Sequence, residues 1–120
     1  MITAWGRVVY NYADDSLSSE EIVHKGRYIR QIIGQFQNGD YFVMSVDCTG
    51  YTGLTAPKTN EAGVSYDDIA AFCIAKGARI AYSLDGGGSC ETTIGDRQVN
   101  PIFDGTTGRP CPTVIYWSAD

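Results

Sequence analysis

The sequence predicts an α+β fold: a mostly β, mixed sheet with hairpins and one principal helix packed on the sheet. Three observations lead to this expectation. Two strand-like runs flank Asn38-Gly39, a helical pattern begins after Ser65, and a further strand-like run, Ala78 to Leu84, follows the helix. The 120 residues are enough for one hydrophobic core and too few for two ordinary domains, so we expect a single domain over residues 1–120.

The first third of the chain predicts a short strand, a polar loop and a β-hairpin. Trp5 to Tyr10 suggests a short strand, and Asp14 to Glu21 looks like a polar loop. Arg30 to Phe36 and Tyr41 to Val46 then form a β-hairpin around Asn38-Gly39. That dipeptide favours a type I′ turn, in which both central residues take positive φ.

The middle of the chain predicts a loop followed by the helix. Thr49 to Val64 is rich in Gly and Thr and has no sustained period, which indicates a long loop of the kind that often carries function. Ser65 is an N-cap, Asp68 completes a capping box, and Gly77 is the expected residue just beyond the C-terminus. We expect the helix from about Tyr66 to Lys76, with Ile69, Phe72 and Cys73 facing the sheet.

Three elements complete the prediction. Arg79 to Leu84 returns as a strand, and a second hairpin, Glu91 to Ile94 with Arg97 to Val99, turns at Gly95-Asp96. Thr113 to Trp117 is expected to form a final strand.

Composition excludes several function classes. The formal net charge is −5 with no basic run, which speaks against unspecific nucleic-acid binding. The chain contains neither a membrane-length apolar segment nor a signal peptide, so we expect no membrane insertion. Cys48, Cys73, Cys90 and Cys111 form no CxxC pair, which disfavours zinc; one or two disulfides are conceivable, but we favour mostly buried free thiols.

The run Tyr82 to Ser89 delivers Asp85 from a strand into the glycines 86–88. Consecutive glycines indicate that the main chain approaches something closely or takes positive φ. A flexible linker is the alternative, but the strand-like and turn-like flanks favour a compact site. Asp47 and Asp85 both end strands that flank the helix. If these strands are parallel neighbours, both carboxylates lie at one edge of the sheet, where we place the site.

Several motifs resemble the phosphodiester glycosidase domain. They are Arg30 to Gly34, Val46-Asp47, Gly53 to Ala78, Leu84 to Ser89, Val99-Asn100-Pro101, Asp104 and Gly108-Arg109-Pro110. The resemblance covers residues 24–118. Residues 1–23 match poorly and lack the family's Asn-Gly-Gly-Phe-Phe-like motif, so the domain looks truncated relative to the family.

The resemblance implies hydrolysis of a sugar 1-phosphodiester, for example in a teichoic-acid-like cell-wall glycan. Asp85 is the first candidate for the catalytic carboxylate and Asp47 the second. Either aspartate can instead cap a turn through its own backbone. Arg30 and Arg109 are candidates for phosphate binding, although each can instead form an internal ion pair with Asp85 or Asp104.

The other candidate binding residues are Gly86, Gly87, Gly88, Ser89 and Tyr51. The glycine amides can form an anion-binding nest or a tight turn, Ser89 adds a hydroxyl, and Tyr51 lies in the long loop. No cofactor is expected, and a divalent cation such as calcium near Asp85 is conceivable but unassigned.

The alternative hypothesis is a non-catalytic function. A reduced domain of this family can serve as a glycan-binding or structural module of a phage tail or baseplate. The expected partners are a phosphorylated glycan and, with the choice left open, other subunits of an assembly or further copies of the chain. The expected location is extracellular or in a virion.

Overall fold

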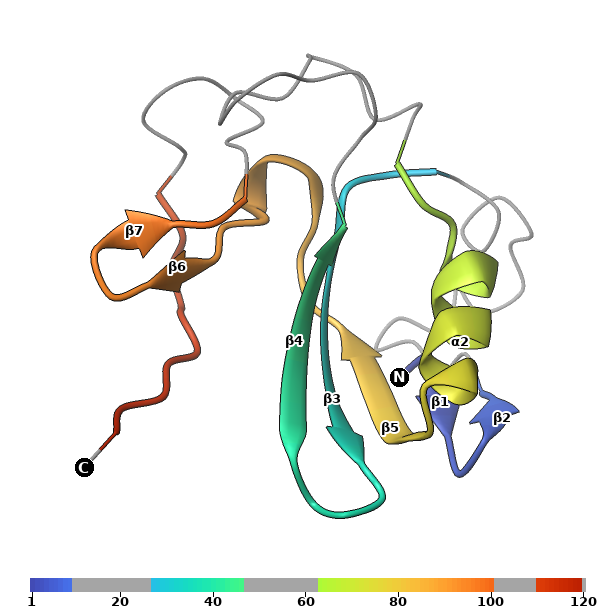
Figure 1. The fold of residues 1–120 in the computed structure, drawn as a ribbon. Coiled ribbons are helices and arrows are strands. Elements are labelled where there is room, and N and C mark those ends of the chain that lie inside the picture. Colours follow the sequence, from blue (N-terminus) through green and yellow to red (C-terminus); the bar gives the residue numbers. More distant parts are fainter. Residues whose placement is uncertain (10–26, 47–62, 101–109, 120) are drawn as a thin grey trace.

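Five strands form one antiparallel sheet, and a helix covers one of its faces (Figure 1). The computed structural model describes residues 1–9, 27–46, 63–100 and 110–119. The strand order is β2-β1-β5-β3-β4, with bounds β1 Thr3–Ala4, β2 Arg7–Val8, β3 Arg30–Phe36, β4 Tyr41–Val46 and β5 Ala78–Ser83. The α+β prediction is confirmed. All pairings of these strands are antiparallel, whereas the sequence predicted a mixed sheet.

The β3–β4 hairpin is confirmed, but its turn is not of type I′. Gly39 has a φ of 95°, whereas Asn38 does not take positive φ. Phe36 N–H donates to Asp40 O at 2.8 Å, and Gly39 N–H donates to Phe36 O at 3.1 Å. The Asn38 side chain accepts a hydrogen bond from Asp40 N–H at 3.1 Å. This local contact favours a three-residue loop with one left-handed glycine over the two-residue turn.

The N-terminal segment turns back on itself where the sequence predicted a continuous strand. Trp5 and Gly6 have φ values of 54° and 74°, and they join β1 to β2. A bulky residue at positive φ is strained. Trp5 has two compensating contacts: its N–H donates to Arg79 O at 2.7 Å, and the Arg79 guanidinium carbon lies 4.6 Å from its ring centroid.

Helix α2, Tyr66–Ala75, begins and ends as predicted. Ser65 accepts a hydrogen bond from Asp68 N–H, the Asp68 carboxylate accepts one from Ser65 N–H, and Gly77 follows the helix with a φ of 76°. Ile69 and Cys73 face the sheet as expected, but Phe72 is 48% exposed. The buried stripe is completed by Ala70 instead. At about 3.6 residues per turn, this leaves Phe72 at the border of the stripe.

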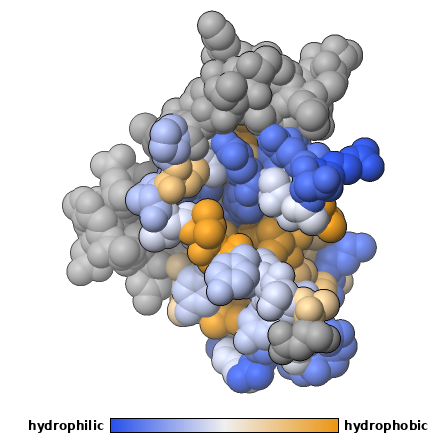
Figure 2. Space-filling view, turned by 90° about the vertical axis from the view of Figure 1, so that its left-hand side faces the viewer, coloured by the Kyte–Doolittle hydropathy of each residue, from blue (hydrophilic) through white to orange (hydrophobic). Residues whose placement is uncertain are grey.

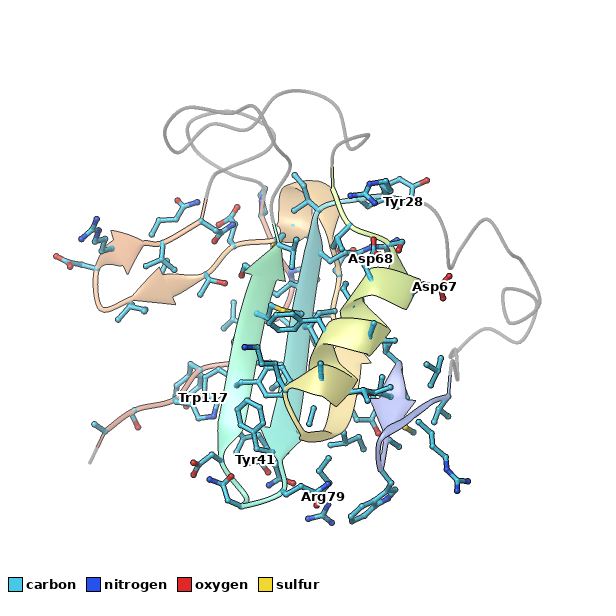
Figure 3. All side chains as sticks on the ribbon, turned by 45° about the vertical axis from the view of Figure 1, so that its right-hand side comes forward. Tyr28, Tyr41, Asp67, Asp68, Arg79 and Trp117 are labelled. Carbon is cyan, nitrogen blue, oxygen red and sulfur yellow. The ribbon has the colours of Figure 1, made fainter. Side chains whose placement is uncertain are left out.

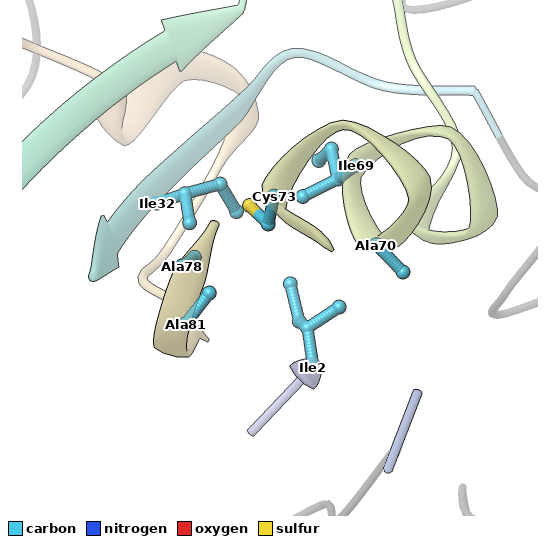
Figure 4. Packing of buried hydrophobic residues seen from close by; sticks show 7 residues of the cluster. All are labelled: Ile2, Ile32, Ile69, Ala70, Cys73, Ala78 and Ala81. Atoms are coloured by element: carbon cyan, nitrogen blue, oxygen red, sulfur yellow. The ribbon is translucent and has the colours of Figure 1, made fainter. Parts of the chain in front are cut away.

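The hydrophobic core lies between α2 and the strands β1, β3 and β5 (Figure 4). Its buried members are Ile2, Ile32, Ile69, Ala70, Cys73, Ala78 and Ala81. Phe42, Met44, Val64 and Tyr66 pack around them. Burial raises the pKa of the Cys73 thiol, which is a free thiol as expected. Small residues on β5 let the helix approach the sheet closely.

The second hairpin is confirmed in shorter form, with β6 at Thr93–Ile94 and β7 at Arg97–Gln98. The predicted strand Thr113 to Trp117 is wrong. Residues 110–119 form no strand with the residues that the structure describes, and Val114 and Tyr116 are 78% and 81% exposed. An apolar run becomes a strand only where a neighbouring strand pairs with its backbone.

Apolar side chains gather on the side of the molecule that carries β4 and the β6–β7 hairpin (Figure 2). Tyr41 to Val43 on β4 and Trp117 line a shallow pocket of about 250 Å³ there. Tyr41 and Trp117 lie beside each other near the lower end of β4 (Figure 3). Within the described part of the chain, no helix is long and apolar enough to span a membrane.

We expect Ser65→Ala to lower the free energy of unfolding by about 1 kcal/mol, because it removes the N-cap of α2.

Hydrogen bonds from the Ser65 side chain and backbone, followed by the charge of Arg27, lower the pKa of Asp68 from its ordinary 3.8. The ionised Asp68 therefore stabilises the fold above that value, and the contribution is lost as the pH falls through the lowered folded pKa. Urea unfolding of the wild type and Ser65→Ala at pH 7 measures the loss of the N-cap. The same experiment on the wild type at pH 7 and at pH 3 measures the loss of the Asp68 contribution at low pH.

Ser118→Ala is the matched control, since Ser118 is exposed and lies outside every helix and strand. Its free energy of unfolding should stay within about 0.5 kcal/mol of the wild type. Equal losses in the two variants would contradict the capping role of Ser65.

Candidate functional site

Among the predicted site residues that the structure describes, Arg30, Asp85 and the glycines that follow Asp85 lie at one edge of the sheet. β3 begins where β4 and β5 end, because both neighbours run antiparallel to it: Arg30 pairs with Val46, and Ile32 pairs with Ser83. Asp85, two residues beyond the end of β5, therefore lies at the edge where β3 starts. The strands β4 and β5 are not neighbours, however, because β3 separates them. Asp47 itself lies outside the described residues.

The Asp85 side chain is exposed and contacts the backbone of the next residue. Its Oδ1 accepts a hydrogen bond from Gly86 N–H at 2.9 Å. This is the turn contact that we considered as the alternative role of Asp85. It fixes one carboxylate oxygen while the residue stays open to solvent. A fixed and hydrated carboxylate suits electrostatic stabilisation or activation of water.

The glycine run is a compact turn, so the linker alternative is wrong. A Cβ at Gly86 would lie 2.5 Å from the carbonyl oxygen of Ile29, and Gly87 has a φ of 57°. Gly87 N–H donates to the same carbonyl at 3.0 Å, and Gly87–Ser89 form a 3₁₀ turn, η2. The amides of Gly86 and Gly87 thus have acceptors inside the protein. A phosphate contact of these glycines stays a prediction, as does that of the half-buried Ser89.

Arg30 contacts two aromatic rings at the same edge. Its guanidinium carbon lies 3.8 Å from the ring centroid of Tyr66 and 4.9 Å from that of Tyr28. Arg30 Nε–H also donates to Val64 O at 3.4 Å. The residue is only partly buried. Stacking of a guanidinium on aromatic faces is favourable and restricts its orientation.

Tyr66 also contacts the end of β5, the strand that precedes Asp85. Its hydroxyl shares a hydrogen bond of 3.0 Å with Ser83 Oγ, and Ser83 Oγ donates to Leu84 O at 3.0 Å. Neither Tyr28 nor Tyr66 was among the predicted site residues, because an aromatic residue is most often a packing residue. The position of Tyr66 directly after an N-cap, at the end of the helix that faces the strand ends, is the signal that was available.

Comparison with known proteins decides the family. The model described as phosphodiester glycosidase matches residues 1–117. The chain belongs to the phosphodiester glycosidase family. The match includes residues 1–23, where no motif of the family was recognised in the sequence.

Two proteins that are similar to this phosphodiester glycosidase domain are much longer than the chain, which spans less than a fifth of each. An SPbeta prophage-derived uncharacterized protein, YomE, of Bacillus subtilis (strain 168) is 29% identical over 79 residues, which are 66% of this chain and 11% of that protein. A hypothetical protein from Synechocystis, known from a crystal structure, has a TM-score of 0.60 and 24% identity over 84% of this chain and 17% of its own. The latter similarity supports the fold alone.

Hydrogen bonds on the sheet face opposite the helix fasten the glycine turn of the phosphodiester glycosidase domain to β3 and β4. Thr92 Oγ1 accepts from Gln31 Nε2 at 2.9 Å and shares a hydrogen bond of 2.8 Å with Ser45 Oγ. The buried Asn100 accepts from Thr92 N–H and donates to Cys90 O. The segment that follows η2 is therefore hydrogen-bonded to β3 and β4 through Thr92 and to Asn100 through its backbone. These contacts restrict the position of the turn that follows Asp85.

The remaining predicted site residues lie outside the part of the chain that the structure describes. Arg109 and Tyr51 lie outside the described residues, as does Asp104, the alternative partner of the arginines. In the part of the domain that is described, no three His, Cys, Asp or Glu side chains are grouped so that they could hold a metal ion. For this phosphodiester glycosidase domain, the structure thus brings Arg30, Asp85 and the glycine turn to one edge and adds Tyr28 and Tyr66.

Proposed function

We propose that the protein hydrolyses a glycosyl phosphodiester at the edge formed by Arg30 and Asp85. The observation that carries this proposal is their common position: an exposed carboxylate and a stacked guanidinium lie at the same end of adjacent strands in a member of the phosphodiester glycosidase family. Such a pair suits a substrate in which an anionic phosphate is attached to a sugar carbon.

The roles follow from the chemistry of the bond. Water adds to the anomeric carbon, the bond between that carbon and the phosphate oxygen breaks, and a phosphomonoester leaves. Phosphate is a good leaving group, so strong acid assistance is dispensable. Asp85 stabilises the positive charge that develops at the anomeric carbon or accepts a proton from the water. Arg30 binds the phosphate through its guanidinium group.

More specifically, the proposed substrate is a phosphodiester-linked glycan of a cell surface, such as a teichoic-acid-like polymer. The proposed location of the protein is a virion or the outside of a cell. The relative from a prophage supports this setting. The glycan and other subunits of an assembly are the proposed partners. No step in this proposal needs a cofactor or a metal ion.

A substrate comparison tests the proposal. The protein is incubated with a methyl phosphodiester of N-acetylglucosamine 1-phosphate and, separately, with methyl N-acetylglucosaminide, which lacks phosphate. We expect free N-acetylglucosamine and methyl phosphate from the first, with kcat/KM at least about 100-fold above that for the second. No release from the phosphodiester would contradict the proposal.

The second candidate is a non-catalytic glycan-binding module. It is favoured by the hydrogen bond from Gly86 N–H to Asp85 Oδ1, which gives this carboxylate a structural role in the glycine turn. Saturable binding of the phosphodiester, measured by calorimetry, without any release of sugar over a day would support this candidate against the enzyme.

A further inference from the structure

We propose that Tyr66 is a positioning residue that fixes both Arg30 and the backbone that leads into Asp85, so that one side chain sets the distance between the phosphate-binding and the carboxylate groups. This inference rests on the proposed function and deepens it, because it names what holds the two groups in register. Tyr66 does not itself need to touch the substrate.

The ring of Tyr66 acts on Arg30. The guanidinium carbon lies 3.8 Å from the ring centroid, closer than the 4.9 Å to the ring of Tyr28. A guanidinium stacked at this distance has its plane set by the ring, and the plane determines where its donors point. A phosphate contact through two donors depends on that orientation.

The hydroxyl of Tyr66 acts on the segment before Asp85. It is bonded to Ser83 Oγ, which donates to the carbonyl of Leu84, the residue that precedes Asp85. Leu84 N–H donates to Gln31 O at 2.8 Å. The peptide groups on both sides of Leu84 are thus restrained just before the glycine turn begins, one by β3 and one through Tyr66.

Tyr66 is itself firmly held. It is the first residue of α2, directly after the capping box of Ser65 and Asp68, and it packs at the border of the hydrophobic core. The isolated pairing of Tyr28 with Val64 places the second ring beside the start of the helix. In Figure 3, Tyr28 and Asp68 lie together at this end of α2, whereas Arg79 lies at the other end of the sheet. The start of α2 is therefore a rigid support for the site.

Two substitutions separate the two contacts. Tyr66→Phe keeps the ring and removes the hydroxyl, whereas Tyr66→Leu removes both. With the phosphodiester of N-acetylglucosamine as substrate, we expect Tyr66→Phe to keep KM within about twofold and to lower kcat about fivefold. We expect Tyr66→Leu to raise KM about tenfold and to lower kcat as well.

Tyr82→Leu is the matched control. Tyr82 is 42% exposed, and on β5 it lies next to Ser83 but points to the other face of the sheet. Both kinetic constants should stay within about twofold of the wild type. Circular dichroism melts show whether each variant is folded at the assay temperature. A Tyr66→Leu variant that is folded and keeps the wild-type KM would overturn the inference, as would identical kinetic constants for the Phe and Leu variants.

A binding measurement keeps the inference distinct from the proposed function. The dissociation constant of N-acetylglucosamine 1-phosphate is measured by calorimetry for the wild type and both variants. An inactive wild type that binds this probe contradicts hydrolysis, yet a tenfold weaker affinity only in Tyr66→Leu still supports positioning of Arg30. Unchanged affinity in Tyr66→Leu, or no saturable binding by the wild type, overturns the positioning role.

Discussion

Asp85→Asn is expected to lower kcat for the sugar phosphodiester at least about 100-fold while KM changes by less than about threefold. The amide oxygen of asparagine can still accept the hydrogen bond from Gly86 N–H, so the glycine turn and the fold are preserved. What is lost is the negative charge, which is the part of Asp85 that stabilises positive charge at the sugar carbon or takes a proton. Initial rates over a range of substrate concentrations measure both constants.

Asp96→Asn is the control for this experiment. Asp96 is exposed in the turn between β6 and β7, and the substitution changes the net charge by the same amount. The activity of this variant should match that of the wild type. A kcat for Asp85→Asn within tenfold of the wild type would remove Asp85 from the catalytic role, and the enzyme proposal would then depend on a carboxylate elsewhere, with Asp47 as the other candidate.

Ile32→Ala is expected to lower the free energy of unfolding by about 3 to 4 kcal/mol. Ile32 is fully buried in the core beneath α2 (Figure 4), on β3, which is paired with β5 on one side and β4 on the other. Truncation removes apolar contacts and leaves a cavity that the rigid strand pairing on both sides cannot close. For a domain of this size the loss is a large share of the total stability, and urea unfolding at 25 °C measures it.

The same substitution at Ile94 provides the comparison. Ile94 is 71% exposed on β6, so Ile94→Ala removes the same atoms without making a cavity, and its stability should stay within about 0.5 kcal/mol of the wild type. Ile32→Ala also loosens the support of Arg30, two residues away on the same strand face. A loss below 1 kcal/mol for Ile32→Ala would contradict the position of the core between α2 and β3.

The sequence was sufficient where the structural signal is local. The capping box of Ser65 and Asp68 and the glycine after the helix predicted α2 almost to the residue, because these contacts involve neighbours in the chain. The three glycines predicted a close backbone approach, and Gly86 indeed packs against the Ile29 carbonyl. The family motifs likewise predicted membership, which the family comparison confirms.

The errors arose where distant residues decide the outcome. Thr113 to Trp117 has the composition of a strand, but no described strand pairs with it. Phe72 lies at helical spacing, yet Ala70 takes its place against the sheet because small residues allow the closer contact. The Asn38-Gly39 dipeptide favours one turn, but a hydrogen bond between the Asn38 side chain and Asp40 N–H selects another.

The sequence by itself determined the family, the principal helix and both hairpins, because helix caps, turn residues and short motifs act over a few neighbouring positions. The tertiary structure alone decided the strand order, with β3 between the two strands that end at the site, and the stacking of Tyr28 and Tyr66 on Arg30. Those features depend on contacts between residues far apart in the sequence, for example Ile32 with Ser83 and Arg30 with Tyr66. Such contacts form only when the whole sheet and its helix pack together.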